Sequence, residues 1–222
     1  MRARIAEVFK SVQGEGVYRG ASQVFVRFFG CNLNCAFCDT KLNFYQNLTL
    51  DEVLEKIFSY KDYHSVSLTG GEPLLQIDFL KNLAKYLKEE GKTIYLETNG
   101  TLYNNLSEII EYVDIIAMDF KSPSSTSQGD FWGEHKEFLK VALRKKVFVK
   151  AVICRSTTFS DLKKAVELLN SFKEQVSFII QPNSFEIDEE LNDKIEYFFS
   201  FSGKYLSDVR IAGQLHKAMS WR

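Results

Sequence analysis

The stretch Val24-Phe25-Val26-Arg27-Phe28-Phe29 is rich in β-branched and aromatic residues and ends at Gly30. Its length and composition predict a buried β-strand. Five more runs of this kind follow along the chain, at residues 65–68, 93–96, 114–118, 147–153 and 176–180. Because nearly continuous apolar runs are typical of strands that are covered on both faces, we expect these segments to form a parallel sheet.

Amphipathic helical patterns lie between most of these strands. The clearest covers residues 50–58, because Thr49-Leu50-Asp51-Glu52 matches a capping box. The others cover residues 77–90, 105–112, 134–143, 159–172 and 188–199. Strands that alternate with helices predict right-handed crossovers, and therefore an α/β fold that is either a barrel or a doubly wound sheet.

The number of strands favours an incomplete barrel. A complete barrel of eight strand–helix units takes about 250 residues, whereas this chain has 222 residues, six strong strands and a weak seventh at residues 208–212. We predict a partial TIM-like barrel of about six parallel strands with the helices outside and one open side. We expect a single domain over residues 1–222, in which the Ser-rich residues 121–132 form a surface insertion or a lid.

Composition limits the classes of partner. Apolar residues make up 45% and aromatic residues 14% of the chain, which suffices for a folded core. Lys and Arg number 28 against 29 Asp and Glu, so the charge gives no reason to expect binding to nucleic acid or an anionic membrane. The N-terminus lacks the apolar region of a secretory signal, and no apolar run reaches the roughly 20 residues that span a bilayer. We therefore expect a cytoplasmic protein that binds a small molecule.

Three of the four cysteines fall within eight residues, Cys31-Asn32-Leu33-Asn34-Cys35-Ala36-Phe37-Cys38. In a reducing compartment such a group indicates metal binding or redox chemistry. Three thiolates on one short loop can hold three corners of an iron–sulfur cube and leave its fourth iron open. An open iron can bind the amine and carboxylate of S-adenosylmethionine, whose one-electron cleavage gives a 5′-deoxyadenosyl radical.

Two other interpretations of the cysteines are weaker. A structural zinc site needs a fourth ligand, but His64, His135 and His216 are scattered along the chain. A thioredoxin-type C-x-x-C site leaves Cys31 without a role. Cys154 ends an apolar run and is predicted to be a buried core thiol.

The C-x3-C-x2-C spacing resembles that of the radical S-adenosylmethionine superfamily. Residues 69–73 (TGGEP) match the superfamily's G-G-E-P segment, which meets the methionine amino group, although a simple strand-to-helix turn is the alternative. Further polar sets follow the strands at residues 97–99, 119–121 and 181–183, and active sites of α/β barrels lie at the carboxyl ends of the strands. The resemblance implies a cofactor site formed by Phe37, Asp39, Gly71, Glu72, Glu97, Asp119, Lys121 and Gln181.

Residues 11–20 (SVQGEGVYRG), Arg27 and residues 30–40 (GCNLNCAFCDT) resemble the 7-carboxy-7-deazaguanine synthases, radical enzymes of queuosine and 7-deazapurine biosynthesis. The similarity covers residues 5–76, with weaker agreement at residues 214–217. It implies a lyase that converts 6-carboxy-5,6,7,8-tetrahydropterin to 7-carboxy-7-deazaguanine with loss of ammonia. It also implies one 4Fe–4S cluster held by Cys31, Cys35 and Cys38, regenerated S-adenosylmethionine, and Mg²⁺.

The resemblance assigns the pterin substrate to Val12, Gln13, Gly14, Glu15, Arg27 and Thr69. A glycine-flanked loop that carries Gln13 and Glu15 can offer acceptors and donors to the pterin edge. Arg27 lies among aromatic residues, where its charge suits the substrate carboxylate, and a salt bridge at the rim is the alternative. Thr40 offers the hard oxygen that Mg²⁺ prefers.

Two rival functions remain open. A glycyl-radical activating enzyme shares the cysteine cluster and the G-G-E-P segment, but it would not need residues 13–16 (QGEG). A non-catalytic iron–sulfur electron carrier is disfavoured because three ligands leave one iron open. As partners we expect a reductase such as flavodoxin or ferredoxin and a second copy of the chain in a homodimer. The tail at residues 218–222 is a candidate to close over the substrate.

Overall fold

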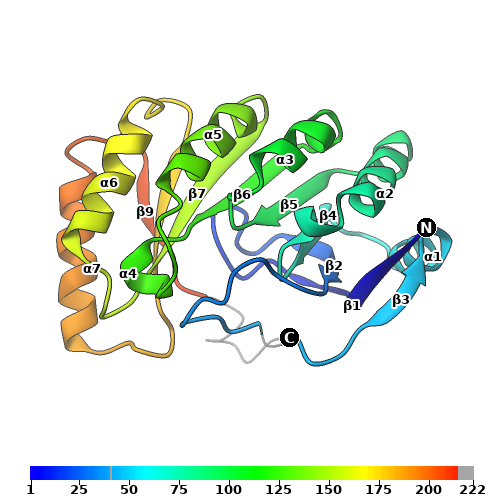
Figure 1. Cartoon of the computed structure of the whole chain (residues 1–222), viewed down its shortest axis with the longest axis horizontal. Coiled ribbons are helices and arrows are strands. Elements are labelled where there is room, and N and C mark those ends of the chain that lie inside the picture. Colours follow the sequence, from blue (N-terminus) through cyan, green and yellow to red (C-terminus); the bar gives the residue numbers. More distant parts are fainter. Residues whose placement is uncertain (41, 215–222) are drawn as a thin grey trace.

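The computed structural model describes residues 1–40 and 42–214, so the tail that was expected to close over the substrate lies outside the described residues. All nine described strands belong to one sheet, in the order β3-β1-β2-β4-β5-β6-β7-β8-β9. The helices curve around the outer face of this sheet (Figure 1). β3 and β9 form the two edges of the described sheet, so the barrel is open, as predicted.

Seven neighbouring strands run parallel. All six predicted apolar runs are confirmed as strands, and the weak seventh run is confirmed as the edge strand β9. Because these strands run parallel, their carboxyl ends lie at one edge of the sheet. The parallel strands are β2 (Ser22–Phe28), β4 (Ser65–Gly70), β5 (Ile94–Thr98), β6 (Ile115–Phe120), β7 (Lys146–Ile153), β8 (Ser177–Pro182) and β9 (Val209–Ile211).

The predicted helices are also present. At the start of α1 the Thr49 side chain accepts from the Glu52 N–H and the Glu52 side chain accepts from the Thr49 N–H, which confirms the capping box. The segment 105–112 differs from the prediction, because its last turn is a 3-10 helix, η2 (Ile110–Tyr112). The helices are α1 (Leu50–Phe58), α2 (Ile77–Glu89), α3 (Tyr103–Ile109), α5 (Trp132–Ala142), α6 (Phe159–Asn170) and α7 (Glu189–Ser202), with a 3-10 turn, η1 (Pro73–Gln76), before α2.

Two strands were not predicted. β1 (Arg2–Val12) pairs antiparallel with β2, and β3 (Gln46–Thr49) pairs antiparallel with β1. β1 escapes a search for apolar runs because Arg2, Arg4, Glu7 and Lys10 alternate with its apolar residues, as is usual where one face of an antiparallel strand meets water. β3 is short, polar and largely exposed, which is typical of an edge strand.

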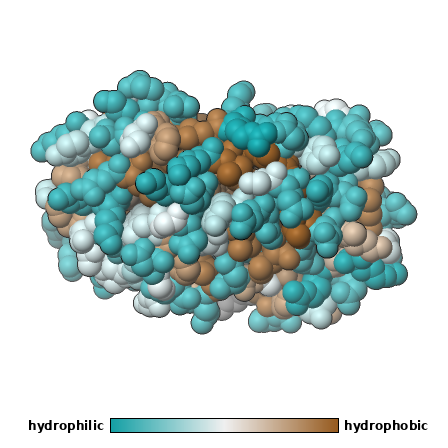
Figure 2. All heavy atoms as spheres, turned by 45° about the horizontal axis from the view of Figure 1, so that its top comes forward, coloured by the Kyte–Doolittle hydropathy of each residue, from teal (hydrophilic) through white to brown (hydrophobic). Residues whose placement is uncertain are grey.

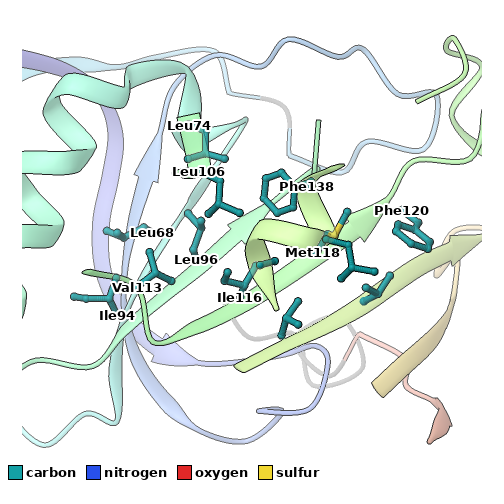
Figure 3. Packing of buried hydrophobic residues seen from close by; sticks show 14 of the residues in the cluster. Leu68, Leu74, Ile94, Leu96, Leu106, Val113, Ile116, Met118, Phe120 and Phe138 are labelled. Carbon is teal, nitrogen blue, oxygen red and sulfur yellow. The ribbon is translucent and has the colours of Figure 1, made fainter. Parts of the chain in front are cut away.

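The main core lies between the sheet and the outer helices. In Figure 3, Leu68, Leu96 and Met118 from the strands lie close to Leu106 and Phe138 from the helices. Hydrophilic side chains dominate the face shown in Figure 2, with apolar side chains visible between them. No helix in the described part of the chain is long and apolar enough to span a membrane.

A smaller apolar cluster closes one end of the sheet's inner face. Tyr18, from the connection between β1 and β2, packs against Tyr95 and Phe148, with ring centroids 5.8 and 6.4 Å apart. In the same connection Gly16 has φ +65, and a Cβ there would lie 2.4 Å from the Phe148 ring. Only glycine therefore allows this segment to lie against the sheet. The segment forms the floor of the cavity described next.

Candidate active site

A cavity of ≈ 470 Å³ lies where the parallel strands end, and both the cysteine loop and the β1–β2 connection contribute to its wall. The sequence predicted most of this wall. Seventeen of the eighteen predicted site residues line the cavity, namely Val12, Gln13, Gly14, Glu15, Arg27, Cys31, Cys35, Phe37, Cys38, Asp39, Thr40, Thr69, Gly71, Glu97, Asp119, Lys121 and Gln181.

The cysteine loop follows β2, as predicted. Cys31 and Cys38 are exposed, Cys35 is half-buried, and all three thiols are free. Partial burial raises the pKa of the Cys31 and Cys35 thiols above their usual value. Cys154 differs from them, since it is buried and burial raises its pKa to about 11.

The Gly70-Gly71 turn supports the start of the cysteine loop. The Gly71 N–H donates to the Phe28 carbonyl at 3.0 Å, and the Glu72 N–H donates to the Gly30 carbonyl at 2.8 Å. A Cβ on Gly71 would lie 2.1 Å from the Gly30 oxygen. The backbone of the G-G-E-P segment therefore approaches the cysteine loop in a way that only glycine permits.

Residues 121–132, predicted to form a surface insertion or a lid, support the cysteine loop. It contains a short helix, α4 (Pro123–Thr126), which lies beside the loop in Figure 1. The Ala36 N–H donates to the Thr126 carbonyl at 2.9 Å. The Gln128 side chain accepts from the Asn34 N–H at 3.3 Å and donates to the Asn34 carbonyl at 2.9 Å. These three hydrogen bonds hold the middle of the loop.

The donor set fits an iron–sulfur cluster. Three free thiols line a cavity whose wall also contains the Gly-Gly turn and several acidic residues. Among the described residues no three Cys, His, Asp or Glu side chains gather around one point as a single metal ion requires. A cube takes its thiolates at separate corners, and thiolates are the ligands that iron–sulfur clusters prefer.

Glu72 is the one predicted site residue outside the cavity wall. Its carboxylate is fully buried and accepts from the Leu74 N–H at 3.1 Å, from the Asn99 N–H at 2.7 Å and from the Thr98 hydroxyl. Burial raises the pKa of Glu72 to about 7, while these hydrogen bonds act in the opposite direction. The Glu72 side chain therefore joins the end of β5 to the Gly-Gly turn.

Four charged groups form a connected network in the wall of the cavity. The Lys150 Nζ lies 2.5 Å from Glu15 Oε2 and 3.3 Å from Asp119 Oδ1, and the Lys121 Nζ lies 2.9 Å from Asp119 Oδ2. Asp119 and Lys150 are partners in the β6–β7 register, so the fold itself sets their distance. Two carboxylates thus face two ammonium groups.

The charges in this network stabilise one another. Burial alone would raise the pKa of Glu15 and of Asp119. Lys150 and the hydrogen bond from Gln214 outweigh burial at Glu15, and Lys121 and Lys150 outweigh it at Asp119, so both pKa values lie below normal. Burial alone would lower the pKa of Lys150, but Asp119 and Glu15 raise it well above its usual value. All four groups are therefore charged at neutral pH.

Gln13 is already engaged by protein groups. Its amide Nε2 donates to Glu97 Oε1 at 2.7 Å and to Gln23 Oε1 at 3.0 Å, and its Oε1 accepts from the Glu15 N–H at 3.0 Å. Its exposure is 3%. Thr69 donates to the other Glu97 oxygen at 2.7 Å. The Gln13 amide, which lines the cavity, therefore also positions Glu15 and Glu97.

Arg27 lines the cavity and also forms the predicted alternative, a salt bridge. Its Nε lies 3.3 Å from Glu7 Oε1, and its guanidinium lies 5.3 Å from the centroid of the Phe9 ring. Its side chain keeps 28% exposure. The guanidinium thus lies in the cavity wall with one edge beside a carboxylate of the protein.

Thr40 and Asp39 lie at the mouth of the cavity. The Thr40 hydroxyl is 3.3 Å from Asp39 Oδ1. The Gln214 amide donates to Asp39 Oδ2 at 3.1 Å and to Glu15 Oε1 at 2.6 Å. Gln214, which lies 199 residues after Glu15, thus connects two walls of the site.

Sequence reasoning missed several residues that form this site. Lys150 is the most important, and its signal was a lysine inside the apolar strand 147–153. An ionisable residue in such a strand requires a buried partner. Asn99 and Asn183 lay within the polar sets noted at the strand ends, but neither was assigned a role.

Known proteins resemble this chain over its whole described length. A family model described as Radical SAM superfamily matches residues 25–198. The 7-carboxy-7-deazaguanine synthase of Geobacter sulfurreducens is 34% identical over 98% of this chain and 97% of that protein. The protein of the same name from Methanothermobacter thermautotrophicus is 32% identical over 100% of this chain and 99% of that protein.

A solved structure supports the fold. The crystal structure of QueE from Escherichia coli matches with a TM-score of 0.68 over 97% of this chain and 95% of that chain, at 22% identity. The matched family model spans the cysteine loop, the Gly-Gly turn and most of the parallel sheet. The chain belongs to the radical SAM superfamily and, within it, to the family of 7-carboxy-7-deazaguanine synthases.

Proposed function

We propose that this protein is a carbon–nitrogen lyase that converts 6-carboxy-5,6,7,8-tetrahydropterin to 7-carboxy-7-deazaguanine with loss of ammonia. The observation that carries the proposal is one cavity in which the three-cysteine loop, Arg27 and the Glu15 network face the same space. Relatives that are 34% and 32% identical over nearly their whole length carry the corresponding name. The cavity volume of ≈ 470 Å³ suits a small molecule better than a protein segment, which disfavours the glycyl-radical activating enzyme.

Cys31, Cys35 and Cys38 hold the 4Fe–4S cluster, and the neighbouring wall accommodates S-adenosylmethionine. When bound, the two groups together supply a carbon-centred radical. Lys121 and Asp119 lie in the wall beside Phe37, whose ring centroid is 5.4 Å from the Lys121 Nζ. In this proposal Asp119 accepts from ribose hydroxyls, and Phe37 covers one face of the adenosyl group.

The substrate is bound by the opposite part of the wall. In this proposal the Arg27 guanidinium, which lines the cavity, donates to the substrate carboxylate, while its Nε stays near Glu7. The carboxylates of Glu15 and Glu97 accept from the amine and ring N–H groups of the pterin edge. Gln13 acts by donating to the Glu97 carboxylate and by accepting from the Glu15 backbone N–H, and Lys150 keeps Glu15 ionised.

Magnesium is part of the proposal through Thr40. A hydroxyl next to the carboxylate of Asp39 offers hard oxygen atoms, which Mg²⁺ prefers. An ion at this place would neutralise the substrate carboxylate and fix its position. A reductase of the flavodoxin or ferredoxin type, assembly as a homodimer and a cytoplasmic location complete the proposal.

Variants of Arg27 test the substrate assignment. Radical formation needs the cluster, the cofactor and an electron, whereas product formation also needs the bound substrate. Arg27→Ala should raise KM for the pterin by tens to thousands of fold, because loss of a charge-assisted hydrogen bond in a partly desolvated site costs about 2–5 kcal/mol. Arg27→Lys should recover only part of the lost affinity for the pterin, because an ammonium cannot make the planar two-point contact of a guanidinium.

The readouts are 5′-deoxyadenosine without substrate and deazaguanine with substrate. Slow cofactor cleavage without substrate should survive in both Arg27 variants, with iron content unchanged. The matched control is Arg19→Ala, since Arg19 is exposed and outside the cavity wall. Equal loss of both activities in the Arg27 variants would assign Arg27 to radical formation instead, and an unchanged KM would remove it from the site.

A further inference from the structure

One side-chain donor from the sheet points at a cysteine of the cluster loop. The Asn99 Nδ2 lies 3.8 Å from the Cys31 Sγ, within the range of an N–H···S hydrogen bond. Asn99 is only 5% exposed and follows the end of β5, 68 residues along the chain from Cys31. The contact is therefore made by the fold and is not a local property of the cysteine loop.

Neighbouring groups fix which side of the Asn99 amide faces the sulfur. The Asn99 Oδ1 accepts from the Thr101 N–H at 3.1 Å and from the Thr101 hydroxyl at 2.7 Å. The Nδ2 also donates to Asn32 Oδ1 at 2.8 Å, and the Asn32 amide donates in turn to the Thr101 hydroxyl at 2.9 Å. Because two donors engage the oxygen, the nitrogen of the amide must be the atom beside Cys31.

We propose that Asn99 is a positioning residue that raises the reduction potential of the cluster through its N–H···S contact with Cys31. Reduction adds one negative charge to the cluster, and part of that charge resides on the sulfur atoms. A donor aimed at a ligand sulfur stabilises the reduced form more than the oxidised form. The protein thereby makes the one-electron reduction that precedes cofactor cleavage easier. This inference concerns the cluster alone and does not depend on which substrate is bound.

A second N–H also reaches Cys31, but it belongs to the loop itself. The Leu33 N–H lies 3.4 Å from the Cys31 Sγ. This donor is backbone and is kept in every side-chain variant. Substitution of Asn99 therefore removes one of the two donors that the described residues offer to Cys31, so we expect a lower potential and a retained cluster.

The structure supplies a matched control inside the same cavity. The Asn183 Nδ2 lies 3.5 Å from the Sγ of Cys154, and its Oδ1 accepts from the Phe185 N–H. Asn183 also lines the cavity and is 6% exposed. Asn183→Asp thus removes an N–H···S donor and adds a negative charge, as Asn99→Asp does, but the sulfur concerned is not a cluster ligand.

The experiment is an anaerobic redox titration of the reconstituted holoprotein without S-adenosylmethionine, followed by the electron paramagnetic resonance signal of the reduced cluster. For Asn99→Asp we expect the ratio of reduced to oxidised cluster at a fixed potential to fall at least fivefold. For a one-electron couple, a tenfold change in this ratio corresponds to 59 mV, so the fall corresponds to a shift of about 40 mV to lower potential. Asn183→Asp should shift the potential by less than half as much.

Thr101→Val provides a variant without any change of charge. It removes the hydroxyl that holds the Asn99 oxygen but keeps the Thr101 N–H, so the potential should fall by a smaller amount. This variant carries the test if Asn99→Asp does not retain its iron. Equal shifts in Asn99→Asp and Asn183→Asp would show that charge alone is measured and would overturn the proposal. An unchanged potential in Thr101→Val, or in an iron-replete Asn99→Asp, would also overturn it.

Discussion

Replacement of Lys150 by methionine tests the charged network in the cavity wall. Lys150 is 5% exposed, and its Nζ lies 2.5 Å from Glu15 and 3.3 Å from Asp119. Methionine reproduces the lysine side chain as far as Cε and removes the ammonium group with its charge. Glu15 then retains Gln214 as its hydrogen-bond donor, and Asp119 retains Lys121.

The expected loss of stability follows from the burial of this pair. Removal of one partner from a buried ion pair costs about 3–5 kcal/mol, because the other charge stays buried without compensation. For a chain of this size that loss corresponds to a fall of about 6–20 °C in Tm. The matched control is Lys140→Met, since the Lys140–Glu137 pair is half exposed and such pairs contribute at most about 1 kcal/mol.

The pH dependence of stability gives a second, independent test of the network. In the parent protein the pKa values of Glu15 and Asp119 lie below normal, so their stabilising contribution is present at neutral pH and is lost as the pH falls through those values. Without Lys150 burial should raise the pKa of one carboxylate above its unfolded value, and the resulting penalty disappears as the pH falls. The stability difference between parent and Lys150→Met should therefore shrink between pH 7.5 and pH 5.

The assay is anaerobic urea unfolding of both variants and the parent at these two pH values, followed by circular dichroism. A loss below about 1 kcal/mol at pH 7.5, similar to that of Lys140→Met, would refute the stabilising role of the network. A large loss that is the same at both pH values would show that packing, and not charge, explains the effect.

Three further predictions concern the cysteine loop. Alanine at Cys31, Cys35 or Cys38 should abolish assembly of an intact cluster, measured as iron and sulfide content. Cys154→Ala should keep the iron and sulfide content of the parent protein. Full iron content in Cys35→Ala would contradict the ligand assignment. Gln128→Ala removes both hydrogen bonds to Asn34 and should speed the release of iron to a chelator several-fold. The control is Gln175→Ala, since Gln175 is exposed. Equal rates of iron release in the two variants would show that the Gln128–Asn34 contact is dispensable. Gly71→Ala should prevent cluster assembly, because its Cβ would lie 2.1 Å from the Gly30 oxygen. Gly133→Ala is the control, since a Cβ at Gly133 meets nothing within 4 Å. Normal iron content in Gly71→Ala would contradict the packing argument.

The parallel sheet was predictable because its strands are buried on both faces. Their composition alone separates them from the amphipathic helices, as residues 24–29 and 147–153 illustrate. β1 was not predictable in this way, because one face carries charged residues and its pairing with β2 supplies the context that the sequence lacks. Local composition therefore identifies strands that are buried on both faces and misses strands with one solvent-exposed face.

The site was predicted best where a motif lies within a few residues. The cysteine loop and the Gly-Gly turn are of this kind. Lys150 and Glu15 are 135 residues apart, so only the tertiary fold brings them together, and the β6–β7 register places Asp119 beside the same lysine. The fold also supplies the partners of two further polar side chains. Gln13 donates to Gln23 and Glu97, and Glu72 accepts from the backbone at the end of β5. A sequence shows which polar groups are present and does not show which of them already have partners.

The central claim is that this cavity carries out the ring contraction of a carboxylated tetrahydropterin. The direct measurement is anaerobic incubation of the reconstituted protein with S-adenosylmethionine, a reductant, Mg²⁺ and 6-carboxy-5,6,7,8-tetrahydropterin. The account predicts the chromophore of 7-carboxy-7-deazaguanine, one ammonia per product, and no product in Cys35→Ala. Formation of 5′-deoxyadenosine with unchanged pterin, in protein with full iron content, would contradict it.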